Sequence, residues 1–151
     1  MLNVVLIEPK IAPNTGNIMR LCAAFKCRLH LVHPLGFRLT DKDLERAGMD
    51  YIQQVEKVEW DSVEQFLEKN ADAPLYFFST KGIKKYYELE YSDESFLIFG
   101  SETNGLPAHL YDEYKDKLYT IPMRGEARSL NLASSVAIVL GECMRQKDYD
   151  F

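Results

Sequence analysis

The sequence has few cysteines, no apolar run long enough to cross a membrane and no signal-peptide pattern. Its three cysteines lie at positions 22, 27 and 143 of 151 residues, a spacing that matches no metal site. An odd and scattered set of cysteines is typical of free thiols in a reducing compartment. We therefore expect a cytoplasmic protein with no membrane partner.

Positive charge is also scarce. The chain has 18 lysines and arginines against 23 aspartates and glutamates, which gives a formal net charge of −5. This balance argues against a polybasic nucleic-acid binder. It leaves room for local basic patches, because contact with phosphates depends on the charges near the contact and not on the sum.

Several common motifs of catalysis are missing. The first apolar run is not followed by G-x-G-x-x-G, and no Walker lysine motif or G-x-S-x-G elbow is present. Dinucleotide binding, P-loop chemistry and serine-hydrolase chemistry are thereby disfavoured. The three histidines, His30, His33 and His109, are not spaced as metal ligands, so we expect no metal. We expect His30 and His33 to be surface or half-buried residues.

The apolar pattern predicts an α/β fold with a mainly parallel sheet flanked by helices, formed by one domain over residues 1–151. The predicted strands are Leu2–Ile7, Arg28–Val32, Val55–Trp60, Pro74–Ser79, Phe96–Gly100 and Leu118–Ile121. The first predicted helix begins at Asn17, and the last ends at Gln146. Three further helices are predicted over Thr40–Gly48, Asp61–Lys69 and Pro107–Tyr114. Continuous apolar runs such as Leu2–Ile7 are expected of strands that are buried on both faces.

Turn and cap residues set the expected helix boundaries. Pro13–Gly16 has turn chemistry, so the first helix is placed after it. Asp61 and Ser129 are predicted N-caps, because their side-chain oxygens can accept hydrogen bonds from free backbone N–H groups. The last helix carries small residues at 133–135, 137 and 141, which allow another backbone to approach it closely.

Four polar segments follow predicted strands, namely Glu8–Arg20, Ser79–Gly82, Gly100–Pro107 and Pro122–Asn131. In an open parallel sheet these segments gather at the carboxyl edge, where ligands bind. Gly100 and Gly105 allow close approach to a ligand, although glycines that only make turns would look the same. The first N–H groups of the last helix, near Ser129, are a candidate anion site.

Arg20 is the most interesting charged residue, and it follows Asn17 by one helical turn on the predicted first helix. A surface arginine would show the same pattern. Glu8 and Glu102 are open to three interpretations: a general base, a ligand-orienting group or a salt-bridge partner of Arg20. Residues 81–94 form the longest polar connection, and we regard them as a possible mobile binding loop.

Three stretches resemble the motifs of SPOUT-class RNA 2′-O-methyltransferases. They are EPKIAPNTGNIMR (Glu8–Arg20), FGSETNGLP (Phe99–Pro107) and IPMRGEARSLNLASSVAIVL (Ile121–Leu140). Together with AGMDY (Ala47–Tyr51) and STKG (Ser79–Gly82), they look most like the subfamily that methylates the wobble cytidine or uridine of tRNA. The resemblance runs from the first strand to the last helix and includes no additional RNA-binding domain.

The resemblance implies a C-terminal trefoil knot that holds S-adenosyl-L-methionine, although chains rarely thread through their own loops. It implies cofactor contacts from Phe78, Gly100, Ile121, Ser129 and Leu130. It also implies a homodimer through the C-terminal helix, with Arg20 reaching the partner's cofactor pocket. Arg20 is then the expected catalytic residue, and the groups expected to orient the hydroxyl or cofactor are Asn14, Glu102, Ser129 and Asn131.

The implied substrate is the ribose 2′-hydroxyl of nucleotide 34 in the tRNA anticodon loop. Candidate RNA contacts are Arg20, Lys26, Arg28, Arg38, Arg46, Tyr51, Lys81, Lys84, Lys85, Tyr86, Tyr87, Arg124 and Arg128. Two alternatives stay open, namely a SPOUT enzyme that acts on ribosomal RNA and a non-catalytic module that binds cofactor or RNA.

Overall fold

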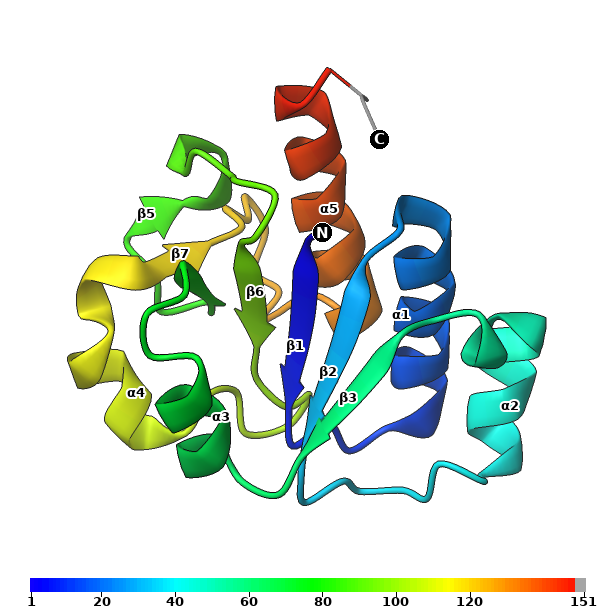
Figure 1. Cartoon of the computed structure of the whole chain (residues 1–151). Coiled ribbons are helices and arrows are strands. Elements are labelled where there is room, and N and C mark those ends of the chain that lie inside the picture. The colour runs from blue at the N-terminus through cyan, green and yellow to red at the C-terminus, as the bar shows by residue number, and fades with distance from the viewer. Residues whose placement is uncertain (149–151) are drawn as a thin grey trace.

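A parallel sheet of seven strands forms the centre of the protein in a computed structural model that describes residues 1–148, with only the backbone described at position 49 (Figure 1). The strands are β1 (Asn3–Ile7), β2 (Arg28–Val32), β3 (Lys57–Trp60), β4 (Leu75–Phe78), β5 (Lys84–Lys85), β6 (Phe96–Phe99) and β7 (Leu118–Thr120). Their order across the sheet is β3-β2-β1-β6-β4-β7-β5, and each neighbouring pair is parallel. The predicted α/β fold is confirmed.

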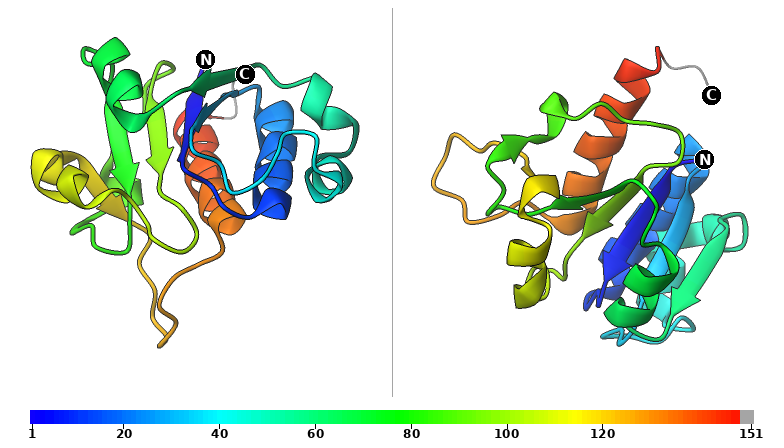
Figure 2. Two further views of the ribbon diagram at one scale, coloured as in Figure 1. Left: turned by 90° about the horizontal axis from the view of Figure 1, so that it is seen from below. Right: turned by 60° about the vertical axis from the view of Figure 1, so that its left-hand side comes forward.

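Helices cover both faces of the sheet (Figures 1 and 2). They are α1 (Ala12–Phe25), α2 (Lys42–Gly48), α3 (Val63–Lys69), α4 (Ala108–Glu113) and α5 (Leu132–Gln146), with short 3-10 turns at Met49–Gln53, Tyr86–Glu88 and Lys115–Lys117. Helices α1 and α5 pack on one face, whereas α3 and α4 pack on the other.

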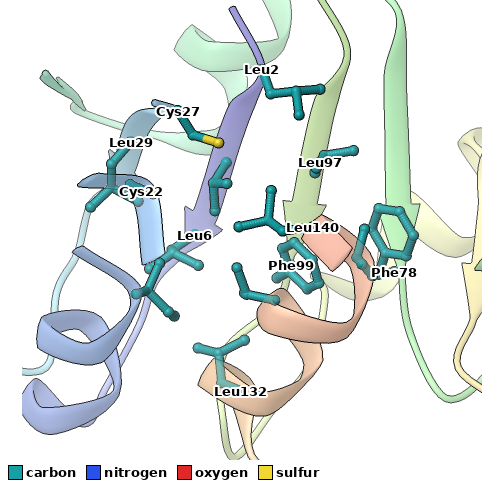
Figure 3. Close-up of a cluster of buried hydrophobic side chains, with 14 of the residues drawn as sticks. Leu2, Leu6, Cys22, Cys27, Leu29, Phe78, Leu97, Phe99, Leu132 and Leu140 are labelled. Atoms are coloured by element: carbon teal, nitrogen blue, oxygen red, sulfur yellow. The ribbon is translucent and has the colours of Figure 1, made fainter. Parts of the chain in front are cut away.

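Alternate residues of β1 point to opposite faces, as the two-residue period of a strand requires. Val4 and Leu6 join the apolar cluster that includes α1 and α5, and Figure 3 shows Leu6 in one cluster with Leu140 and Leu132 of α5. Val5 and Ile7 join the cluster under α3 and α4. All five residues of β1 are buried, which explains why the whole run is apolar apart from Asn3.

Three predicted helix starts were wrong. Pro13–Gly16 is not a turn, because α1 already begins at Ala12 with Pro13 in its first turn, where the missing N–H of proline costs nothing. Helix α3 is capped by Ser62, whose side chain accepts a hydrogen bond from Gln65 N, and not by Asp61. Helix α5 is capped by Asn131, which accepts from Ser134 N, and not by Ser129.

The polar connection over residues 81–94 contains structure that the sequence pattern did not indicate. Lys84 and Lys85 form β5, which pairs with Tyr119 and Thr120 at one edge of the sheet. A 3-10 turn at Tyr86–Glu88 follows, with Glu88 Oε2 accepting a hydrogen bond from Lys85 N. Two residues are too few for a periodic pattern, so β5 could not be recognised.

His30 is fully enclosed rather than on the surface or half-buried. Only 3% of its surface is exposed, and its ring packs with Trp60, Phe66 and Phe96. Trp60 Nε1 donates to Nδ1 at 3.0 Å, and Nε2 lies 2.9 Å from Asn3 Oδ1. Because an indole N–H can only donate, the ring is neutral with its proton on Nε2.

Cys22, Cys27 and Cys143 are buried free thiols. Burial raises the pKa of Cys27 to about 12, so this side chain stays a neutral thiol within the core. None of the helices in the described part of the chain is long and apolar enough to cross a membrane.

Candidate active site

A cavity of about 490 Å³ opens at the carboxyl ends of β4, β6 and β7, where ligand sites of parallel sheets are found. Its walls come from the ends of these strands, from the loops that follow them and from the start of α5. The cavity brings together all five predicted cofactor contacts, which are Phe78, Gly100, Ile121, Ser129 and Leu130. Asn14, Glu102 and Asn131 also line it, whereas Arg20 does not.

The loop after β6 forms a tight turn at the cavity wall. Ser101 and Gly105 exchange two backbone hydrogen bonds of 3.0 Å, and Gly105 has a φ of +67°. A Cβ on Gly100 would lie 2.1 Å from the carbonyl carbon of Gly105 and 2.3 Å from Leu106 N. Glycine is therefore required at position 100 because of backbone contact, and it is favoured at position 105 by the left-handed conformation.

Glu102 uses this turn to reach the beginning of α1. Its carboxylate accepts hydrogen bonds from Lys10 N at 2.9 Å and from Ile11 N at 2.6 Å. Ile11 is the N-cap of α1 and has no capping side-chain oxygen of its own. A carboxylate at this position binds otherwise free N–H groups and interacts favourably with the positive end of the helix dipole. Glu102 is therefore not the salt-bridge partner of Arg20.

Two asparagines extend the connection to α5. Asn14 Nδ2 lies 3.4 Å from Glu102 Oε2, and Asn14 Oδ1 accepts a hydrogen bond from Asn131 Nδ2 at 3.0 Å. Asn131 Oδ1 in turn accepts from Ser134 N at 3.2 Å, which caps α5. This series of hydrogen bonds joins the loop after β6 to the first turns of two helices.

Arg20 lies on the exposed side of α1, beside a second cavity of about 610 Å³. Asn17 lines the same cavity, as expected from one helical turn of separation. The guanidinium carbon of Arg20 lies 5.9 Å from the centre of the Tyr51 ring, within the range of a cation–π interaction. No ion pair to Arg20 is found among residues 1–148.

The two cavities adjoin each other, because Asn131 lines both. The second cavity is otherwise lined mainly by α1 and the start of α5, including Ala23, Ala24, Ala133, Ser134 and Ala137. Glu8, the other candidate acid, lines neither cavity, and its backbone has a φ of 51° at the end of β1.

Tyr111 is a site residue that the sequence interpretation missed. Its hydroxyl accepts hydrogen bonds from Leu106 N at 3.3 Å and from Ser79 Oγ at 3.4 Å, so it joins the loops after β6 and β4. Lys81 Nζ lies 4.5 Å from the centre of the same ring. A tyrosine on a six-residue helix carries no local signal of this role, because both partners come from other segments.

The protein is thus a parallel α/β domain with a cavity that is lined by the segments after three strands. The sequence profile of the SpoU rRNA methylase family matches residues 1–141. The chain belongs to this family.

Relatives of known name match almost the whole chain. A tRNA (cytidine(34)-2′-O)-methyltransferase of Saccharophagus degradans is 43% identical over 147 residues, covering 97% of this chain and 96% of that protein. The enzyme of that name in Escherichia coli (strain K12) is 43% identical over 150 residues, covering 99% and 96%.

Solved structures agree with these relatives. A structure described as giving insight into the 2′-OH methylation of C/U34 on tRNA has a TM-score of 0.91 at 39% identity, covering 99% of this chain and 98% of that one. An AdoMet-bound rRNA methyltransferase from Sinorhizobium meliloti has a TM-score of 0.86 at 26% identity, covering 95% of this chain and 56% of that one.

Proposed function

We propose that this protein is a tRNA (cytidine(34)-2′-O)-methyltransferase, which transfers a methyl group from S-adenosyl-L-methionine to the ribose 2′-hydroxyl of C34 or modified U34. The full-length similarity to enzymes of that name supports this assignment. The observation that carries it is the cavity at the carboxyl edge, because it gathers the motif residues of three distant segments around one space.

The cavity fits S-adenosyl-L-methionine in size and in chemistry. Its volume of about 490 Å³ lies within the usual range for small-molecule sites. Phe78 and Phe99 stack with ring centres 5.0 Å apart and, with Leu106 and Ile121, offer apolar surface to an adenine ring. Ser101, Thr103 and Asn104 supply polar groups for the ribose and the amino-acid end. When bound, the cofactor supplies an activated methyl group on a sulfonium.

In this proposal Arg20 assists methyl transfer by electrostatic stabilisation. A guanidinium stays protonated in proteins, so it does not act as the base. Its five N–H donors suit a phosphate of the bound RNA and the charge that develops on the 2′-oxygen. Its exposure and its lack of an ion-pair partner among residues 1–148 leave these donors available.

We infer that the active enzyme is a homodimer through α5, in which Arg20 reaches the partner's cofactor cavity. Arg20 does not line the cofactor cavity of its own chain. The small side chains of α1 and α5 around the second cavity allow a partner helix to approach closely. In this arrangement the second cavity is covered by the other subunit.

We further infer a trefoil knot over the C-terminal segment. Strand β7 lies between β4 and β5, whereas α5 packs against α1 and shares an apolar cluster with β1 and β6. The chain must therefore cross the carboxyl ends of β4 and β6 between residues 121 and 131, a segment that stands out from the body in Figure 2. Residues 1–151 then act as one methyltransferase domain in the cytoplasm.

Transfer of a labelled methyl group tests the proposal. The protein is incubated with labelled S-adenosyl-L-methionine and total RNA that lacks 2′-O-methylation at position 34, and the labelled nucleotide is mapped. We expect label on the ribose of nucleotide 34 of tRNA. Label in ribosomal RNA alone would identify an rRNA enzyme, and cofactor binding without any labelled RNA would identify a non-catalytic module.

A further inference from the structure

Ile83 is the most exposed large apolar side chain in the described part of the protein. It is 94% exposed, whereas the next, Met1, is 48% exposed. A single exposed apolar residue is ordinary on protein surfaces and carries no meaning by itself. The backbone, the charges and the position of the segment around Ile83 indicate a functional contact.

The backbone on both sides of Ile83 is held against the sheet. Gly82 packs so closely on β7 that a Cβ would lie 2.5 Å from the carbonyl carbon of Tyr119, and Gly82 N donates to Ser79 O at 3.1 Å. On the other side, Lys84 pairs with Tyr119 in the β5–β7 ladder. Ile83 therefore projects from a fixed backbone, and binding to it costs little ordering entropy.

The segment that carries Ile83 is locally basic. Residues 79–87 contain Lys81, Lys84 and Lys85 and no acidic residue, in a chain whose formal net charge is −5. All three lysines are exposed. Lys84 Nζ donates to Asp116 O at 3.0 Å, which holds this ammonium group close to the sheet edge. Tyr87, 47% exposed, adds an aromatic side chain at the end of the segment.

Three residues of this segment line the cavity at the carboxyl edge of the sheet. Ser79, Thr80 and Lys81 form part of the wall of the cavity assigned to the methyl donor. Ile83 follows Lys81 by two residues and does not itself line the cavity, so an exposed apolar side chain between lysines lies in the same short segment as part of the cavity wall.

We propose that residues 81–87 form a docking surface for the single-stranded RNA next to the methylated nucleotide. Lys84 and Lys85 bind its phosphates, and Ile83 packs against the face of an unstacked base. Apolar side chains are known to insert against bases, and single-stranded RNA offers such faces in its loops. The proposal deepens the assigned tRNA methylation and rests on it. A protein partner is less suited to three exposed lysines without an acidic neighbour in the segment.

The test separates the apolar contact from the charges. Binding of an anticodon stem-loop RNA with C34 is measured at several salt concentrations for wild type, Ile83→Ser, Ile83→Val and Lys85→Ala, with Lys69→Ala on α3 as a matched control. We expect Ile83→Ser to weaken binding roughly three- to tenfold at every salt concentration, as loss of a base contact would. Ile83→Val should bind nearly as wild type, because it keeps most of the apolar surface.

Lys85→Ala should instead reduce the slope of log affinity against log salt by about 0.7, the value for one lost contact to single-stranded phosphate. Lys69→Ala should leave affinity and slope unchanged. Methyl transfer to position 34 by wild type, together with unchanged RNA binding in both Ile83→Ser and Lys85→Ala, would overturn the docking surface and leave the enzyme assignment intact. Unchanged RNA binding with an altered oligomeric state of Ile83→Ser would instead identify a protein interface. Absence of any transfer by wild type would refute the enzyme assignment itself.

Discussion

Asn14 Oδ1 accepts a hydrogen bond from Asn131 Nδ2 at 3.0 Å, which joins the first turn of α1 to the N-cap of α5 across 117 residues. Asn131 uses both ends of its amide, because its Oδ1 also accepts from Ser134 N. One side chain thus positions the start of α5 and connects it to Asn14 and Glu102. Asn131 also lines both cavities, so this bond lies between them.

Replacement of Asn131 by Ala and by Asp should separate its two functions. Asn131→Ala removes the cap and leaves the Asn14 amide without its partner, so we expect a loss of about 2 kcal/mol in the free energy of unfolding. Asn131→Asp keeps an acceptor for Ser134 N but cannot donate to Asn14. It should retain most of the stability and lose cofactor affinity. Urea unfolding and calorimetric titration with S-adenosyl-L-methionine measure both effects.

Glu102→Gln should distinguish a structural clamp from a general base. A glutamine oxygen cannot replace both carboxylate oxygens toward Lys10 N and Ile11 N, so we expect a loss of about 1–2 kcal/mol in stability and weaker cofactor binding. Glu68→Gln, at an exposed position of α3, serves as the control. Unchanged stability and cofactor affinity with a rate lowered by roughly 10²-fold or more would assign Glu102 to proton transfer instead.

The contact between Arg20 and Tyr51 should affect turnover more than binding of the cofactor. Arg20→Ala should reduce kcat strongly, because it removes the guanidinium proposed to bind the RNA phosphate and the charge that develops on the 2′-oxygen. Tyr51→Leu should reduce kcat by roughly two- to fivefold, the equivalent of an exposed cation–π interaction, and Tyr51→Phe should restore it. Equal kcat values in the Leu and Phe variants would show that the ring does not position Arg20. Steady-state kinetics with tRNA supply the measurement.

Gly100, in the cavity wall, and Gly125, which does not line the cavity, form a matched pair of test and control. Gly100→Ala places a Cβ 2.1 Å from the Gly105 carbonyl carbon, so the loop after β6 must shift and cofactor affinity should fall by at least tenfold. Gly125 has nothing within 4 Å of its Cβ position, and Gly125→Ala should leave affinity and stability nearly unchanged. Thermal unfolding with and without cofactor compares the two variants, and equal cofactor-induced shifts would contradict the close contact at Gly100.

His30 should make stability depend on pH. Burial, together with the positive charge of Arg28, lowers the pKa of His30 from 6.5 to about 4. Protonation of Nδ1 would also break its hydrogen bond with Trp60 Nε1. The folded state therefore binds fewer protons than the unfolded state between these two values. The contribution of neutral His30 to the free energy of unfolding is complete above about pH 6.5. It declines as the pH falls toward about 4, by roughly 2 kcal/mol between about pH 7 and about pH 5. Urea unfolding of wild type and His30→Gln at both pH values isolates this term, and parallel pH profiles would contradict it.

The strands of the sheet were predictable because a continuous apolar run indicates a buried strand. Strands β1, β2, β4 and β6 coincide with the predicted runs to within one or two residues at each end. The caps were less predictable. Asp61 and Ser62 are adjacent and both can cap a helix, so the choice depends on backbone angles that only the folded chain sets.

The sequence by itself determined the fold class and the segments that follow the strands, since apolar periodicity and the alternation of strands with helices can be read along the chain. Tertiary structure alone decided which side chains of those segments meet. Glu102 bonds to residues 91 and 92 positions away, and Asn14 to one 117 positions away. A hydrogen bond requires atoms within about 3 Å. No pattern in a single sequence states that distance, because it arises only when the parallel sheet brings the ends of β1, β6 and β7 to the same edge.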